Sequence, residues 1–184
     1  MFIIKKNYYF YIDNTNPINL RSIRKSLKIV VIYRNNSYNE PFDQILKLRK
    51  ECKRLKFSFY VANNFKLAKK IKADGLYISA FNKNFYTNIK LIGSAHNFKE
   101  INQKIRQRCK TIILSRLFKT NYKEKKDFYG ILKFNLINQK YNLNLIPLGG
   151  INNYNLLKLN LIKSGGFATL SGIKKKPIIS NRLF

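Results

Sequence analysis

The sequence predicts an α/β protein built on parallel strands. Short apolar segments alternate with segments whose apolar residues recur at helical spacing, and this strict alternation is typical of a parallel sheet. Eight such units favour closure into a compact (β/α)8 barrel, the TIM barrel, over the alternative of an open α/β sheet with fewer true strands. At 184 residues we expect a single domain, residues 1–184, with short loops and a truncated last helix.

Eight segments have the composition of strands. They are rich in aromatic, β-branched and other apolar residues, and they end at turn residues such as Asn, Asp, Gly or Ser. The second of them, Lys28 to Tyr33, is a continuous apolar run typical of a strand buried on both faces. In chain order the expected strands are 8–12, 28–33, 57–61, 75–78, 90–92, 111–114, 145–148 and 167–170.

Most of these strands are followed by apolar residues at helical spacing. The expected helices are 17–27, 40–52, 67–71, 98–105, 128–139 and 152–163. The last of them should end at Gly165 and Gly166, because glycine adopts the left-handed conformation that closes a helix. The connection 79–88 is short and weakly patterned, and Lys174 to Pro177 make a poor start for a final helix.

Two neighbouring strand ends near the C-terminus carry small residues. The run 145–148 stops at Gly149 and Gly150, and the run 167–170 is followed by Ser171. Backbone N–H groups exposed by such residues can cradle a phosphate, and in a (β/α)8 barrel such a site lies after strands seven and eight. The alternative is that the glycines only mark turns. We expect a phosphate site at Gly149, Gly150 and Ser171.

The chain is strongly basic, with 37 Lys and Arg against 8 Asp and Glu and a formal net charge of +29. This charge favours contact with nucleic acid or other polyanions. The lysines are spread along the chain, however, and accompany many Asn, Ile, Tyr and Phe residues, which share A/T-rich codons. A dedicated nucleic-acid site concentrates its charge on one face. We therefore expect only nonspecific binding to nucleic acid.

Other features of the composition exclude several classes. No apolar stretch reaches the roughly 18 residues needed to span a membrane, and the first residues make a poor signal peptide. Cys52 and Cys109 are isolated, without the spacing of a metal or redox site. We expect reduced, partly buried thiols in a cytoplasmic protein. The sequence carries no signal for an oligomeric state.

In a barrel of this kind the active site lies at the C-terminal ends of the strands. The residues there are cations, amides, hydroxyls and glycines, with few carboxylates, and this chemistry suits an anionic, phosphorylated small molecule. The set offers neither paired acids for glycoside hydrolysis nor a zinc cluster. Ser94 and His96 have no orienting acid nearby in the sequence, and we interpret His96 as a hydrogen-bonded loop histidine.

Five segments then carry a resemblance to a known family. They are 73–78 (ADGLYI), 91–96 (LIGSAH), 115–123 (SRLFKTNYK), 148–151 (LGGI) and 164–171 (SGGFATLS). In this order and spacing they resemble the thiamine-phosphate synthase family, which also contains the thiazole tautomerases. Arg34, after the second strand, is similar in position to an arginine of that family. The resemblance extends from Tyr8 to Ile173, and the ordered set rather than any single motif makes it specific.

The resemblance implies a (β/α)8 barrel and a reaction. The synthases join an aminopyrimidine diphosphate to a thiazole phosphate and release diphosphate, with magnesium. By resemblance, Ser94, Thr120 and Lys123 would contact the diphosphate side, and Arg34 and Asn63 would line the pyrimidine pocket. The resemblance also implies that a substrate phosphate binds in the glycine turn identified above.

The sequence departs from the family pattern where magnesium would bind. The Asn-Asp after strand three is Asn63-Asn64 here, and the acid after strand four is Asn82. An Asp-to-Asn change keeps the size of the side chain but removes the charge that holds a hard cation. The strand-two Gln and Lys of the family are Ile32 and Asn36. We expect all three asparagines to bind substrate and no residue to bind a metal, so that Mg²⁺ would have to bind without the expected carboxylates.

Three hypotheses follow for the function. The first is a divergent thiamine-phosphate synthase with Arg34, Ser94, Thr120 and Lys123 as its catalytic residues. The second is a family member that binds thiazole phosphate or thiamine phosphate without turnover. The third is a basic nucleic-acid-binding protein on the same fold. The tautomerases use a histidine in the loop after strand six, and none lies between residues 115 and 126.

Overall fold

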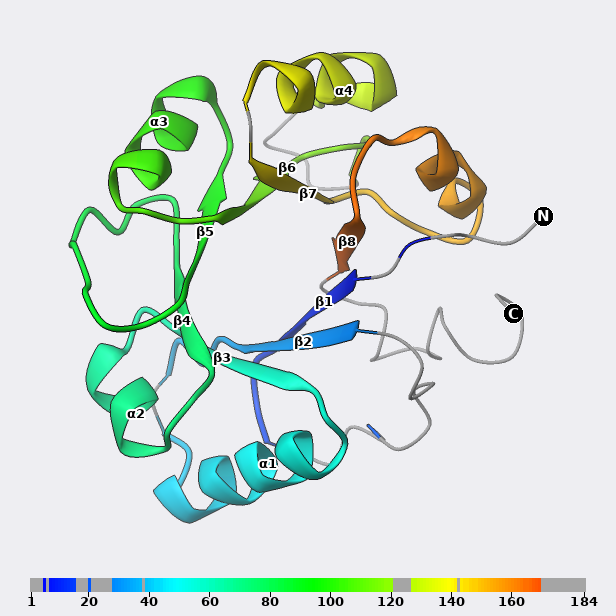
Figure 1. Ribbon diagram of the computed structural model, residues 1–184. Helices are drawn as coiled ribbons and strands as arrows, with labels where there is room; N and C mark the ends of the chain where they lie inside the picture. The colour runs from blue at the N-terminus through cyan, green and yellow to red at the C-terminus, as the bar shows by residue number, and fades with distance from the viewer. Residues whose placement is uncertain are drawn as a thin grey trace.

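The structure, a computed structural model, describes residues 5, 7–15, 20, 28–37, 39–120, 127–141 and 143–169. Within them, eight parallel strands form a closed barrel in sequence order (Figure 1). The strands are β1 (Asn7–Ile12), β2 (Lys28–Tyr33), β3 (Ser58–Ala62), β4 (Gly75–Ile78), β5 (Leu91–Ala95), β6 (Thr111–Ser115), β7 (Asn144–Leu148) and β8 (Gly166–Thr169). Each one overlaps the segment predicted for it, so the (β/α)8 fold is confirmed and the open sheet is excluded.

The barrel closes where the first strand meets the last. β1 pairs with β8 from Asn7 opposite Gly166 to Phe10 opposite Thr169. The two backbones approach so closely that a Cβ atom on Gly166 would lie 2.1 Å from the Asn7 carbonyl oxygen. Only glycine fits such a contact. The expectation that Gly165 and Gly166 end a helix in the left-handed conformation is wrong, because neither has a positive φ and Gly166 begins β8.

Helices surround the barrel in Figure 1. They are α1 (Phe42–Arg54), α2 (Phe65–Lys70), α3 (Phe98–Arg106), α4 (Gly130–Lys140) and the 3-10 helix η2 (Leu156–Leu161). None of these described helices has the length and apolar character needed to cross a membrane. Apart from Leu20, the predicted helix 17–27 lies outside the described residues, as does the predicted truncated last helix. The connection 79–90 contains no helix, in line with its weak pattern.

The helix predicted over 152–163 forms in part only. The structure has a 3-10 helix over six residues, Leu156–Leu161. Its buried residues Leu156 and Leu159, and Ile162 after it, are three positions apart. A 3-10 helix has three residues per turn, so this spacing places the three side chains on one line against the barrel. The apolar pattern therefore favours the tighter helix over the α-helix we expected.

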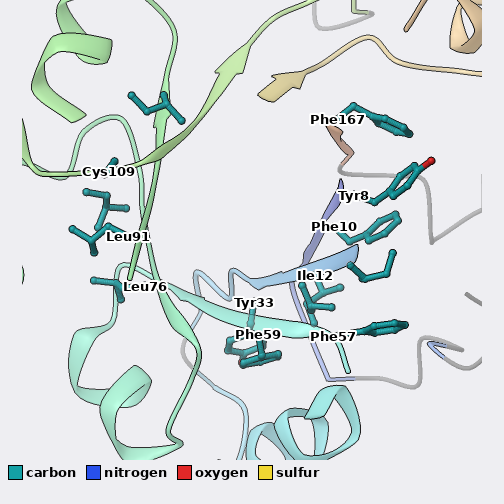
Figure 2. Close-up of a cluster of buried hydrophobic side chains, with 14 of the residues drawn as sticks. Tyr8, Phe10, Ile12, Tyr33, Phe57, Phe59, Leu76, Leu91, Cys109 and Phe167 are labelled. Carbon is teal, nitrogen blue, oxygen red and sulfur yellow. The ribbon is translucent and has the colours of Figure 1, made fainter. Parts of the chain in front are cut away.

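Two apolar layers hold the fold together. One fills the barrel interior and consists of Tyr9, Tyr11, Ile32, Ala62, Tyr77, Ile92, Ile113, Ile146 and Ala168. The other lies between barrel and helices, and Figure 2 shows Tyr8, Phe10 and Phe167 on the outer side of β1 and β8. The rings of Tyr8 and Phe167 meet edge to face with centroids 5.0 Å apart. Such alternation along each strand is what a closed, helix-covered barrel requires.

Both cysteines belong to the outer layer and are free. Burial raises the pKa of Cys52 to about 12 and that of Cys109 to about 12. The thiols therefore stay protonated at neutral pH and act as small apolar groups. This agrees with the expectation of reduced, buried thiols.

An ion pair between the buried Arg49 and the partly exposed Asp74 joins α1 to the barrel. Arg49 on α1 donates from Nη2 to Asp74 Oδ1 at 3.1 Å and from Nε to the Lys72 carbonyl at 3.2 Å. The other carboxylate oxygen of Asp74 accepts the Phe59 backbone N–H at 2.7 Å. Asp74 precedes β4 and Phe59 lies on β3, so one carboxylate connects two strands and a helix.

Three helices end in the same strained way. The residue that follows the C-cap has a positive φ of 53° to 62° and is a long basic residue, namely Lys56, Lys72 or Arg108. In each case the next backbone N–H donates to the carbonyl five residues back, at 2.9 to 3.0 Å. This is the hydrogen bond of a Schellman motif, in which the left-handed position favours glycine.

We predict that Asp74→Asn lowers the free energy of unfolding by about 2–3 kcal/mol, because it leaves the buried Arg49 without its counter-charge. Urea unfolding followed by circular dichroism measures the difference. Asp43→Asn is the matched control, since Asp43 is exposed in the first turn of α1 and its loss should cost less than about 1 kcal/mol. Equal losses for the two variants would contradict the role of the Asp74 contacts.

We also predict that Lys56→Gly stabilises the protein by about 0.5–1 kcal/mol, because glycine adopts the left-handed conformation without steric cost. The control is Lys53→Gly, in the last turn of α1, which should destabilise by about 1 kcal/mol. A rise in thermal midpoint for the first variant and a fall for the second is the expected result. A fall for both would show that Lys56 makes contacts that outweigh the backbone strain.

Candidate functional site

The predicted site residues that the structure describes lie at or just beyond the C-terminal ends of the strands, at one mouth of the barrel. They are Arg34 after β2, Asn63 and Asn64 after β3, Asn82 after β4, Ser94 on β5, Thr120 after β6, and Gly149 and Gly150 after β7. Lys123 and Ser171 lie outside the described residues. This mouth is where (β/α)8 barrels place their chemistry.

Asn63 and Asn82 meet across the ends of β3 and β4. Asn63 has a left-handed backbone with φ of 56°, which asparagine tolerates better than most residues. Its Oδ1 accepts the Ser79 backbone N–H at 2.9 Å and the Asn82 Nδ2 at 3.2 Å. Asn82 Nδ2 also lies 3.3 Å from the Tyr86 hydroxyl. The structure therefore brings together two of the predicted substrate-binding amides.

Asn64 has a different environment. It is the N-cap of α2, and its Oδ1 accepts the Leu67 backbone N–H at 2.9 Å. It also lines a cavity of about 200 Å³ together with Tyr33 and Glu40. This side chain therefore has a structural task in starting α2, while it remains beside a space at the mouth of the barrel.

Glu40, which the sequence reasoning did not select, is an acid of this mouth. Its carboxylate accepts the Tyr33 hydroxyl at 2.6 Å and the Thr15 backbone N–H at 2.6 Å. Burial raises the pKa of Glu40, but these hydrogen bonds outweigh burial and hold the pKa below its usual value. The charged carboxylate thus ties the loop after β1 to the end of β2. Glu40 lies seven residues beyond the end of β2, and no sequence pattern there predicted its contacts with Tyr33 and Thr15.

Asn82 is held from behind by a buried lysine. Lys104 on α3 is fully buried, and its Nζ donates to the Asn82 carbonyl at 2.7 Å and to Gln107 Oε1 at 2.9 Å. Gln107 Nε2 donates to the same Asn82 carbonyl at 3.1 Å. Burial lowers the pKa of Lys104. The stem of Lys104 packs on Gly93, where a Cβ atom would lie 2.9 Å from Lys104 Cγ.

The glycine turn after β7 lies under the loop that follows β6. Gly149 and Gly150 have φ of +97° and +70°, and Phe118 donates its N–H to the Gly149 carbonyl at 3.0 Å. A Cβ atom on Gly150 would lie 2.4 Å from the Phe118 carbonyl oxygen. Thr120 in this loop accepts from Arg116 Nη1 at 2.7 Å. The glycines are therefore required by backbone shape and by close packing, and the phosphate site remains a prediction.

His96, after β5, has an acidic partner. Its Nδ1 lies 3.0 Å from Glu100 Oε2, which also accepts the His96 backbone N–H at 2.6 Å. The expectation that no acid near His96 in sequence orients it is wrong, because the first turn of α3 returns Glu100 to it four residues later. The Tyr129 hydroxyl donates to the His96 carbonyl. His96 is thus a hydrogen-bonded loop histidine, as interpreted from the sequence.

The residues at this mouth do not fit a magnesium ion. Asn82 directs an amide N–H at Asn63 Oδ1, and Asn64, the other position where the family resemblance expects a carboxylate, is a neutral residue that caps α2. Among the described residues, no group of three or more His, Cys, Asp and Glu side chains could hold a metal. Magnesium in proteins relies on carboxylates and substrate phosphates. We therefore derive no step of the chemistry through a protein-bound metal.

Comparison with known proteins agrees with this geometry. The chain is 27% identical over 183 residues to a thiamine-phosphate synthase of Prochlorococcus marinus subsp. pastoris, covering 93% of this chain and 52% of that protein. A homologue from another Prochlorococcus marinus strain is 28% identical over 181 residues, covering 92% of this chain and 50% of that protein. The chain thus spans about half the length of these curated relatives.

Solved structures share the fold. The thiamine phosphate pyrophosphorylase of Pyrococcus furiosus superposes with a TM-score of 0.73 at 16% identity, covering 98% of this chain and 93% of that one. The enzyme of the same name from Bacteroides thetaiotaomicron gives a TM-score of 0.64 at 16% identity, covering 93% and 85%. At the level of sequence, the family model described as thiamine monophosphate synthase matches residues 11–173. This match spans β2 to β8 and the last two residues of β1, and the chain therefore belongs to the thiamine monophosphate synthase family.

Proposed function

We propose that the protein is a divergent thiamine-phosphate synthase that joins an aminopyrimidine diphosphate to a thiazole phosphate and releases diphosphate. The observation that carries this proposal is the contact of Asn63 with Asn82 at the mouth of a barrel of this family. Both positions are those at which the family resemblance expects polar groups beside the substrate. A cytoplasmic location follows from the proposal, because small phosphorylated substrates of this class are made and used inside the cell.

The proposed reaction requires positive charge to stabilise the leaving diphosphate and residues that hold the two substrates in position. The bond between the pyrimidine methylene carbon and the diphosphate oxygen breaks, and the diphosphate leaves with the electron pair. The thiazole nitrogen then supplies the pair for the new C–N bond. Arg34 and the basic loop that includes Thr120 lie on strand ends around the mouth, where cations stabilise a leaving diphosphate. Ser94, buried on β5, and Lys123 complete the proposed catalytic set.

The amide pair fits this chemistry in one respect. Asn63 and Asn82 bring no negative charge near the substrate phosphates, so the repulsion that carboxylates would create is absent. The Gly149–Gly150 turn is the proposed site for the phosphate of the thiazole substrate, with Ser171 as its third member. Asn64 is the proposed binding residue on the side of the α2 N-terminus, next to the cavity near Glu40.

The same amide pair supports an alternative. A family member with amides at Asn64 and Asn82, the two positions expected to supply carboxylates, could bind thiazole phosphate or thiamine phosphate and fail to turn it over. In that case a ligand would raise the thermal midpoint while no product forms. The net charge of +29 adds nonspecific affinity for nucleic acid, which should fall uniformly as salt rises.

We predict that mixing both substrates yields thiamine phosphate, and that chelating Mg²⁺ lowers the rate less than tenfold. Detection of thiamine phosphate by fluorescence after oxidation measures the product. The Asn64→Asp, Asn82→Asp double variant should make the reaction depend on Mg²⁺, because it restores the two carboxylates that the family resemblance expects. Absence of product with and without Mg²⁺ would refute the synthase, and a substrate-induced rise in thermal midpoint would then favour the binding protein.

We further predict that Lys104→Met raises the KM for the pyrimidine substrate about threefold to tenfold, because the Asn82 carbonyl loses its strongest donor and Asn82 is less well positioned. Methionine keeps the apolar stem over Gly93, so the fold should persist. Lys99→Met is the control on the same helix, where the side chain is exposed, and should leave KM unchanged. A loss confined to kcat, or an equal effect of the two variants, would contradict the positioning role.

A further inference from the structure

One hydroxyl in the barrel interior lacks a partner. Tyr11 on β1 is only 6% exposed, and among the described residues nothing completes a hydrogen bond of ordinary geometry with its Oη. The ring of Tyr77 meets the Tyr11 ring edge to face, with centroids 5.4 Å apart. A buried hydroxyl without a partner costs free energy, so its retention in the interior calls for a group that pairs with it in the working protein.

Tyr11 is the last residue but one of β1, near the end of the strand that opens on the mouth with the predicted site. Burial raises the pKa of Tyr11 well above its usual value, the hydroxyl of neighbouring Tyr77 raises it further, and the positive charge of Arg34, just beyond the end of β2, partly offsets these effects. Tyr9, two residues earlier on the same strand, behaves differently. Tyr9 lines a cavity together with Thr111 and Lys110, and hydrogen bonding with Asn144 and Thr111, which begin β7 and β6, offsets part of the rise in its pKa that burial causes. Tyr9 therefore lies toward the end where the strands begin, and Tyr11 lies nearer the mouth.

The neighbourhood of Tyr11 on the adjacent strands is apolar. Tyr11 is paired with Ile32 on β2, and both belong to the interior cluster with Ala62 of β3. Ile32 occupies the position at which the family resemblance expects a glutamine. The polar side chain that the family resemblance expects on β2 is thus absent. The residue paired with it on β1, Tyr11, carries a hydroxyl instead.

We propose that Tyr11 is a substrate-binding and specificity-determining residue, whose hydroxyl hydrogen-bonds with a ring nitrogen or the amino group of an aminopyrimidine that carries its diphosphate toward Arg34. The inference rests on the proposed function and names a contact within the same site. An aromatic heterocycle suits the edge-to-face environment that Tyr77 provides. A hydroxyl can both donate and accept, so it suits either kind of polar atom on such a ring.

The test compares two variants that remove one oxygen atom each. Tyr11→Phe deletes the buried hydroxyl without a hydrogen-bond partner, and Tyr9→Phe is the matched control on the same strand. Calorimetric titration with the aminopyrimidine diphosphate should show about fivefold to tenfold weaker binding for Tyr11→Phe and unchanged binding for Tyr9→Phe. Titration with inorganic diphosphate, which has no ring, should give the same affinity for both variants and the wild type.

The thermal midpoint without ligand distinguishes a substrate-binding hydroxyl from one that stabilises the fold, because removing a stabilising hydroxyl would lower the midpoint. Tyr11→Phe should keep or raise the thermal midpoint, because it removes an unpaired buried oxygen, whereas Tyr9→Phe should lower it. A fall for Tyr11→Phe as large as that for Tyr9→Phe would overturn the inference, and so would unchanged affinity for the aminopyrimidine diphosphate. If the wild type itself fails to bind that compound, the proposed function is refuted together with the inference.

Discussion

The close backbone contact between β1 and β8 is the constraint on which the rest of the structure depends. With Gly166 against the Asn7 carbonyl oxygen, the last strand completes the ring and no sheet edge is left unpaired. Closure of the barrel also fixes the positions of the polar residues at the strand ends. It directs the C-terminal ends of all eight strands to one mouth, so that loops distant in sequence meet there. A larger residue at position 166 would open the ring and separate these loops.

The mouth is supported from outside the barrel as well as from within. Lys104 and Gln107 on α3 hold the connection 79–90, which has no helix of its own, by its backbone carbonyls. On the other side, Glu40 ties the loop after β1 to the end of β2. These anchors lie behind the residues that would touch a substrate. They replace, with hydrogen bonds to charged groups, part of the rigidity that helices provide elsewhere in the barrel.

The substitution of amides for acids changes the electrostatic character of the site. Asn63 and Asn82 bind each other, and the cations around the mouth face no cluster of carboxylates among the described residues. In such a field an anionic substrate is attracted directly by the protein. In the proposed complex, the buried hydroxyl of Tyr11 supplies a polar contact in an interior that is otherwise apolar at that level. Charge and hydrogen bonding are thus divided between the rim and the barrel wall.

The sequence alone determined the eight strands and their order, because each is a short apolar run bounded by turn residues, and this local pattern survives any tertiary context. It also determined the family and the positions of Arg34, Asn63, Asn82 and Ser94 at strand ends. What only the tertiary structure decided is which side chains touch. The contacts of Lys104 with Asn82 and of Glu40 with Thr15 join residues 22 and 25 positions apart.

The local sequence pattern also gave two wrong expectations, one for a glycine and one for a helix. Gly166 looked like a helix terminator and proved to be the residue that closes the barrel, and the leucines after Asn152 formed a 3-10 helix because they are buried every third residue. Lysines, usually solvated, gave no hint that Lys104 is buried. Burial depends on what packs against a side chain, here Gly93 with no Cβ to exclude it. The sequence therefore set the barrel and its strand ends, while the packing of distant segments set the contacts of the site.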